Sequence, residues 1–95
     1  MSIKKLKHKR GYHKKHIPKG EFGKFSKIRE EFLEFEDAHE QKDRIMELCE
    51  MSDILGAMRA YLNEQYGGHV KFKHLIRLAK GTHRAFLNGD RKNES

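Results

Sequence analysis

Five acidic residues in two short groups are the part of this sequence best suited to chemistry. The first group is Glu30, Glu31 and Glu34, and the second is Glu50 and Asp53. Residues three apart on a helix lie about 60° from each other around its axis, so each group presents two carboxylates on one face. If two such helices pack antiparallel, four carboxylates meet, and they repel each other strongly unless a cation lies between them.

Mg²⁺ is the cation that this set of ligands favours, because it is a hard ion that prefers oxygen ligands and often carries phosphates; Mn²⁺ is the expected substitute. Glu50 and Asp53 lie within an apolar segment, where carboxylates are rarely left unpaired. The nearest cationic side chains of that segment, Arg44 and Arg59, are six residues away from them. The sequence therefore predicts a metal site at the four carboxylates.

The spacing of apolar residues predicts an all-α fold with three helices and no strand. The helices are expected over about 21–39, 44–65 and 70–88. The first two form an antiparallel helical hairpin in this prediction, and the third folds back over it. A chain of 95 residues has a marginal core, so the helices are expected to assemble into an oligomeric bundle.

The ends of the predicted helices follow from particular residues. Asp43 is the expected N-cap of the second helix. Tyr66-Gly67-Gly68 ends that helix, and Asn88-Gly89 ends the third. Gly81 is expected to interrupt the third helix.

In the first helix, four apolar residues recur at helical spacing and predict one packed stripe. They are Phe25, Ile28, Phe32 and Phe35. Glu31 and Glu34 lie nearer to this stripe than Glu30, which lies almost opposite. Glu30 is therefore expected to point away from the partner helix.

The net charge of +7 is unevenly distributed along the chain. Residues 1–20 carry eight Lys and Arg and no acid, residues 21–53 are acidic, and residues 54–95 are basic again. We interpret 1–20 as a flexible basic arm, 21–90 as the helical domain and 91–95 as a frayed tail. The arm is a possible nucleic-acid contact. Its candidate residues are Lys4, Lys5, Lys7, Lys9, Arg10, Lys14 and Lys15.

The same arm contains His8, His13 and His16, whose spacing matches no strong zinc motif. We interpret these histidines as incidental. The single cysteine, Cys49, excludes an intramolecular disulfide and fits a reducing compartment. Neither a secretory signal nor a membrane span is predicted, so a cytoplasmic location is expected.

The pattern EExxE followed by ExxD resembles that of the MazG-like all-α nucleotide pyrophosphohydrolases, which include dimeric dUTPases and dCTPases. Glu30, Glu31 and Glu34 match the first part and Glu50 and Asp53 the second, with fifteen residues between Glu34 and Glu50. The resemblance covers about residues 22–87. The segments IREEFLEFEDAHEQ and ELCEMSDILGAMRAYL are also similar to small phage and bacterial members of the family.

The resemblance implies an enzyme that uses Mg²⁺ to cleave a nucleoside triphosphate into a monophosphate and pyrophosphate, in nucleotide-pool control or house-cleaning. It implies a homodimer or homotetramer with active sites near the subunit interface. Metal ligation falls on Glu31, Glu34, Glu50 and Asp53.

The remaining roles in the site also follow from the resemblance. Glu31 or Glu34 would orient or deprotonate the attacking water. Lys80 and Arg84, one helical turn apart, match the family's phosphate-contacting basic residues. Glu30 is assigned to the substrate side of the site.

Two other functions remain open at this point. The chain could be a basic helical dimer that binds nucleic acid through its arm, or a MazG-like adaptor without catalysis. Pyrophosphate release from a panel of nucleotides separates these from the enzyme.

Overall fold

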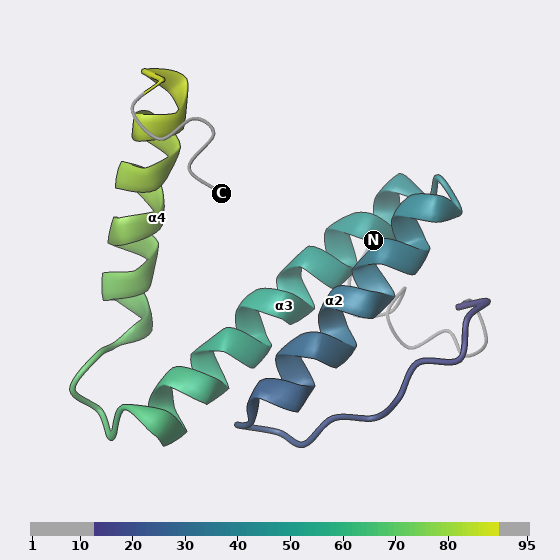
Figure 1. The fold of residues 1–95 in the computed structure, drawn as a ribbon, viewed down its shortest axis with the longest axis horizontal. Helices are drawn as coiled ribbons and strands as arrows, with labels where there is room; N and C mark the ends of the chain where they lie inside the picture. Colours follow the sequence, from purple (N-terminus) through teal and green to yellow (C-terminus); the bar gives the residue numbers. More distant parts are fainter. Residues whose placement is uncertain (1–12, 90–95) are drawn as a thin grey trace.

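The computed structural model describes residues 13–89 and contains three helices in that part of the chain (Figure 1). They are α2 (Phe25–Glu40), α3 (Arg44–Gln65) and α4 (Phe72–Leu87). The described part contains no strand, so the all-α prediction is confirmed. The predictions for the tail and for the arm residues 1–12, including Lys4, Lys5, Lys7, Lys9 and Arg10, lie outside the described residues.

Helices α2 and α3 pack side by side and run in opposite directions (Figure 1). Their connection is short because Asp43 caps α3 directly: its side chain accepts a hydrogen bond from Met46 N–H at 3.0 Å. The predicted N-cap is thus confirmed. Helix α2 begins four residues later than predicted, since Gly23 adopts a φ of 86° and the chain turns at Glu21–Lys24.

The end of α3 is also as predicted. Tyr66 is its C-cap, and Gly67 and Gly68 follow with φ of 55° and 85°, a left-handed conformation that favours glycine. The predicted interruption at Gly81 is wrong, because α4 continues through it to Leu87. One helical glycine costs only about 1 kcal/mol relative to alanine, which the flanking residues offset.

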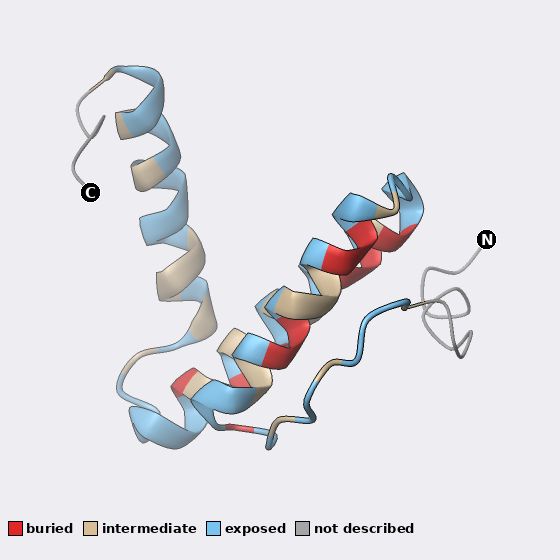
Figure 2. Ribbon diagram, turned by 45° about the vertical axis from the view of Figure 1, so that its right-hand side comes forward, coloured by how far each residue is buried: buried red, intermediate tan, exposed pale blue. Residues whose placement is uncertain are grey.

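The buried residues gather along the seam between α2 and α3 (Figure 2). The apolar ones are mostly small, and they include Ala38, Cys49, Ala57 and Ala60. The largest fully buried side chains are carboxylates, those of Glu50 and Asp37. Small residues let the two helices approach closely. The larger buried positions between them hold acidic side chains, where large apolar side chains are usual.

The phenylalanine stripe of α2 does not form this seam. Phe25 and Phe32 are 59% and 52% exposed, and the face turned to α3 carries Glu31 and Ala38 instead. Ile45, Leu48, Met51 and Leu55 form a similarly exposed row on α3, here called the apolar face of α3. The prediction that α3 is buried on most sides is wrong within one chain, because only one partner helix covers it.

Helix α4 stands apart from the α2–α3 pair in both views (Figures 1 and 2). None of its residues is buried. Arg59 of α3 lies 5.6 Å above the ring of Phe72 at the base of α4. The prediction that the third helix folds back over the acidic hairpin is therefore wrong for the single chain.

Residues 13–24 run in an irregular, mostly extended path beside α2 and α3 (Figure 2). The Gly20 N–H donates to Glu30 Oε1 at 2.9 Å, and Lys15 Nζ lies 2.5 Å from Glu40 Oε1. This docked part of the arm thus covers one side of α2. Within the described range, no helix has the length and apolar character that crossing a membrane requires.

Candidate metal centre

Four carboxylates meet where the middles of α2 and α3 pack together. Glu31 and Glu34 come from α2, and Glu50 and Asp53 from α3. One oxygen of each lies within 4.8 Å of the others. Each pair is spaced i, i+3, so one helical face carries both members, and the opposed directions of the helices bring the pairs together.

The four carboxylates are largely screened from solvent. Glu50 is fully buried and Glu31 is 5% exposed, whereas Glu34 and Asp53 are half-buried. Glu31 Oε1 and Asp53 Oδ2 have almost no contact with solvent. Burial of charged carboxylates is costly unless hydrogen bonds and cations compensate it.

Lys27 supplies positive charge at one end of the cluster of four carboxylates. Its ammonium lies 3.0 Å from Glu30 Oε1 and 3.0 Å from Glu31 Oε2. Burial alone would lower the pKa of Lys27, but the two carboxylates outweigh burial and raise its pKa above the ordinary value. Lys27 therefore stays charged at neutral pH.

Glu30, which the sequence predicts to point away from the partner helix, is buried without being one of the four converging carboxylates. It is 4% exposed and turns to the docked arm, where Gly20 N–H and Lys27 bond to it. Burial raises the pKa of Glu30, but these two donors outweigh burial, and the net pKa lies below its ordinary value. In this structure Glu30 holds the arm against α2.

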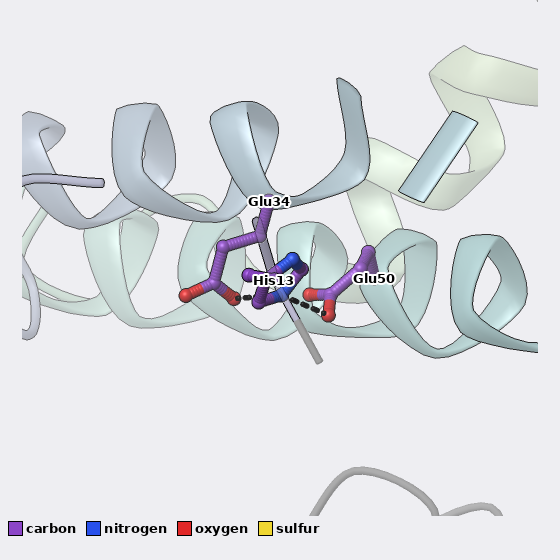
Figure 3. Close-up of side chains that lie close together, drawn as sticks. All are labelled: His13, Glu34 and Glu50. Carbon is purple, nitrogen blue, oxygen red and sulfur yellow. Dashed lines mark hydrogen bonds and ion pairs between the residues drawn. The ribbon is translucent and has the colours of Figure 1, made fainter. Parts of the chain in front are cut away.

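The arm also brings a histidine to the carboxylates. This residue, His13, was interpreted from the sequence as incidental. His13 Nε2 lies 3.1 Å from Glu50 Oε2 and 3.8 Å from Glu34 Oε1 (Figure 3). Its other nitrogen, Nδ1, lies 2.8 Å from Asp37 Oδ2. No local pattern around His13 reveals this, because the contacts join residues 21 to 37 positions apart in the chain.

Asp37 is the second residue of this site that was not predicted from the sequence. Its Oδ2 accepts hydrogen bonds from His13, from the Lys14 N–H at 3.1 Å and from Gln41 Nε2 at 2.9 Å. Burial raises the pKa of Asp37, but these donors outweigh burial and lower its net pKa. Asp37 lies one turn after Glu34 on α2, which was the available signal.

Lys80 and Arg84, the predicted phosphate contacts, are not brought to the carboxylates. Both are exposed on α4, which stands apart from α2 and α3 (Figure 1). Lys80 instead lines a groove of about 680 Å³ at the junction of α3 and α4. The other lining residues are Arg59, Lys71, Phe72, Lys73, Ile76 and Arg77.

The two described candidates for nucleic-acid contact lie over the acidic helix. Lys15 pairs with Glu40, and the backbone of Lys14 bonds to Asp37. Glu40 raises the pKa of Lys15 above its ordinary value. The side chain of Lys15 thus neutralises a charge on α2, whereas the contact of Lys14 is made by its backbone.

The donor set fits a divalent cation. Four carboxylate oxygens within 4.8 Å of one another can surround one ion, and Mg²⁺ and Mn²⁺ both take such ligands. The half-buried Glu34 and Asp53 leave the group open to water or a phosphate oxygen. A second set of donors, His13, Glu34 and Glu50, shares two carboxylates with the first.

Comparison with known proteins adds no family assignment to this geometry. What is established is a small domain that is all-helical in its described part. No protein-family model, no curated protein and no solved structure matches the chain.

Proposed function

We propose that this chain is a metal-dependent nucleoside triphosphate pyrophosphohydrolase. One observation carries the proposal: a fully buried glutamate, Glu50, lies in a group of four carboxylates whose oxygens approach within 4.8 Å. A cation offsets the cost of bringing such charges together, and Mg²⁺ is suited to the oxygen ligands and to phosphates. The choice of nucleoside triphosphate as substrate comes from the EExxE…ExxD pattern.

In this proposal Glu31, Glu34, Glu50 and Asp53 hold Mg²⁺, or Mn²⁺ in its place. The ion would neutralise charge that develops on the phosphate oxygens. Glu34 is the better candidate to orient the attacking water, since Glu31 is buried and bonded to Lys27 whereas Glu34 is half-buried. The products would be a nucleoside monophosphate and pyrophosphate.

The proposed active form is a homodimer or homotetramer. The apolar face of α3 and the exposed phenylalanines of α2 are surfaces that a second copy would cover. Lys80 and Arg84 lie on α4, which stands apart from the carboxylates of its own chain, so in the oligomer they would contact substrate phosphates bound by a neighbouring copy. On this basis Arg84→Ala should lower kcat/KM by about 10²-fold, or about 2.7 kcal/mol.

The decisive experiment measures pyrophosphate release from a panel of NTPs and dNTPs with and without Mg²⁺. Glu50→Gln and Asp53→Asn should abolish both turnover and the rise in Tm that Mg²⁺ causes by binding the native state. Glu36→Gln is the matched control, because Glu36 is exposed on the same hairpin outside the group. Orthophosphate as the only inorganic product, or absence of divalent-ion binding with a nucleotide analogue present, would contradict the proposal.

A second candidate function is binding of a polyanion in the groove between α3 and α4. Residues 65–89 contain five Lys and Arg and no acid, and four of these five line the groove with Arg59. This candidate predicts single-stranded DNA or RNA binding that weakens steeply with salt. Lys73→Ala with Arg77→Ala should remove that binding, while Glu50→Gln leaves it intact.

A further inference from the structure

The imidazole of His13 lies where a ligand of the candidate metal would be expected. Its Nε2 is 3.1 Å from Glu50 Oε2 and 3.8 Å from Glu34 Oε1 (Figure 3). Two ligands at right angles on one ion, with bonds of about 2.1 Å, lie about 3 Å apart. The 3.1 Å separation from Glu50 is that of a hydrogen bond and equally that of two atoms that share an ion, whereas the 3.8 Å separation from Glu34 is longer.

The orientation of the ring is determined by its other nitrogen. Nδ1 lies 2.8 Å from Asp37 Oδ2. A carboxylate oxygen accepts, so Nδ1 donates in this bond. By the same reasoning Nε2 donates to Glu50 Oε2 at 3.1 Å in this structure, and a bound ion would take the place of that proton. Histidines that ligate metals typically donate their second N–H to a carboxylate in this way.

Asp37 is itself held in place. The same oxygen accepts from the Lys14 N–H and from Gln41 Nε2, at 3.1 and 2.9 Å. The arm that carries His13 is anchored again through Gly20 on Glu30. The imidazole thus reaches the carboxylates from a separate segment that two hydrogen bonds, from Lys14 N–H and Gly20 N–H, hold against α2.

We propose that His13 is a nitrogen ligand to a divalent transition metal that Glu34 and Glu50 also bind, with Asp37 as its positioning residue. The inference rests on the proposed function, because it uses two carboxylates of the same centre. Imidazole nitrogen suits Co²⁺, Zn²⁺ and Fe²⁺ better than Mg²⁺, whose preferred ligands are oxygens. The centre would therefore bind a transition metal more tightly than its carboxylates alone allow.

The test compares Co²⁺ and Mg²⁺ binding by calorimetry in the full chain, with the visible absorption of Co²⁺ as a second measure. His13→Ala should weaken Co²⁺ binding by about 10²-fold or more and alter the Co²⁺ spectrum. The same change should weaken Mg²⁺ binding less than about threefold, because Mg²⁺ relies on oxygen ligands. Asp37→Asn should weaken Co²⁺ binding about 10–100-fold.

His16→Ala is the matched control, since His16 is an exposed histidine of the same arm, and it should leave both affinities unchanged. Retained helicity and retained Mg²⁺ binding in His13→Ala would show that the variant is folded. Unchanged Co²⁺ affinity in His13→Ala would overturn the inference, as would a wild type that binds no Co²⁺. Tighter Co²⁺ binding by His13→Ala than by the wild type would also overturn it, since the imidazole would then compete with the ion for the carboxylates.

These outcomes separate this inference from the proposed function. Loss of Co²⁺ affinity in His13→Ala without any nucleotide hydrolysis by the wild type would support the ligand and contradict the enzyme. Pyrophosphate release with Mg²⁺ and no effect of His13→Ala on Co²⁺ would support the enzyme and contradict the ligand.

Discussion

At the scale of single residues, the buried carboxylates differ in what compensates their charge. Glu31, Glu34, Glu50 and Asp53 converge on one another, which suits a bound cation. Glu30 instead accepts from Gly20 N–H, and it shares the ammonium of Lys27 with Glu31. The neighbouring Glu30 and Glu31 thus differ in their contacts: Glu31 belongs to the candidate metal centre, and Glu30 contacts the docked arm.

Glu30→Gln tests this division through the pH dependence of stability. Because the pKa of folded Glu30 lies below its unfolded value, the carboxylate stabilises the protein above the unfolded pKa of about 4.3. That stabilisation is lost as pH falls through the lower, folded pKa. At pH 7 the substitution should cost about 1.5–3 kcal/mol, the usual range for hydrogen bonds to a charged group.

Urea unfolding in the presence of a chelator, repeated from pH 7 to pH 2.5, measures the effect. The difference between wild type and Glu30→Gln should shrink toward low pH. Glu36→Gln, on an exposed glutamate of the same helix, is the control. A constant difference across the pH range would show that the ionised form of Glu30 has no special stability in the fold.

At the scale of elements, the docked part of the arm, residues 13–24, packs against the α2–α3 pair. It places His13 at Glu34 and Glu50 and covers Glu30 through Gly20. Gly20 passes so close to α2 that a Cβ at this position would collide with the backbone carbonyl of Ser26. Only glycine fits here without moving backbone.

Gly20→Ala should therefore loosen the arm. We expect destabilisation of about 1–3 kcal/mol, as for other overpacked sites, and faster amide exchange at Lys14 and Gly20. Gly81→Ala is the matched control, because a Cβ at Gly81 meets open space within α4. That control should stabilise the helix by up to about 1 kcal/mol. Equal effects of the two substitutions would argue against a docked arm.

At the scale of the whole molecule, the fold leaves apolar surface without a partner in the single chain. The apolar face of α3 consists of four residues that are 43–51% exposed, and Phe25 and Phe32 of α2 are exposed further. Soluble monomers rarely leave such rows uncovered. Helix α4 also lacks a covering partner in the single chain, because it stands apart from α2 and α3 and none of its residues is buried.

Leu48→Asn tests whether a second copy covers this surface. The substitution places a polar group in the middle of the apolar face of α3, so it should shift a dimer or tetramer toward monomer. We expect the dissociation constant to rise at least tenfold, which corresponds to a loss of about 1.4 kcal/mol in the free energy of association. Light scattering at micromolar concentration measures the mass. Phe22→Asn, at an exposed residue of the arm, should change nothing. A wild type that is already monomeric would contradict the assembly.

The sequence by itself determined the helices and the four carboxylates. Apolar periodicity, the Asp43 cap and the Gly67-Gly68 break are local signals, and they predicted the limits of α3 correctly. The i, i+3 spacing of the acids is likewise a property of one helix at a time. Such features depend on neighbours within one or two turns, which a sequence displays directly.

Only the tertiary structure decided which faces of these helices meet. Small residues let α2 and α3 approach on the acidic side, which left Phe25 and Phe32 outside although their spacing predicted a packed stripe. The docking of His13 on Asp37 and Glu50, and the path of α4 away from the carboxylates, depend on contacts between distant segments. Periodicity shows that a helix has a distinctive face, but the partner of that face depends on the balance of close approach, charge and burial over the whole chain.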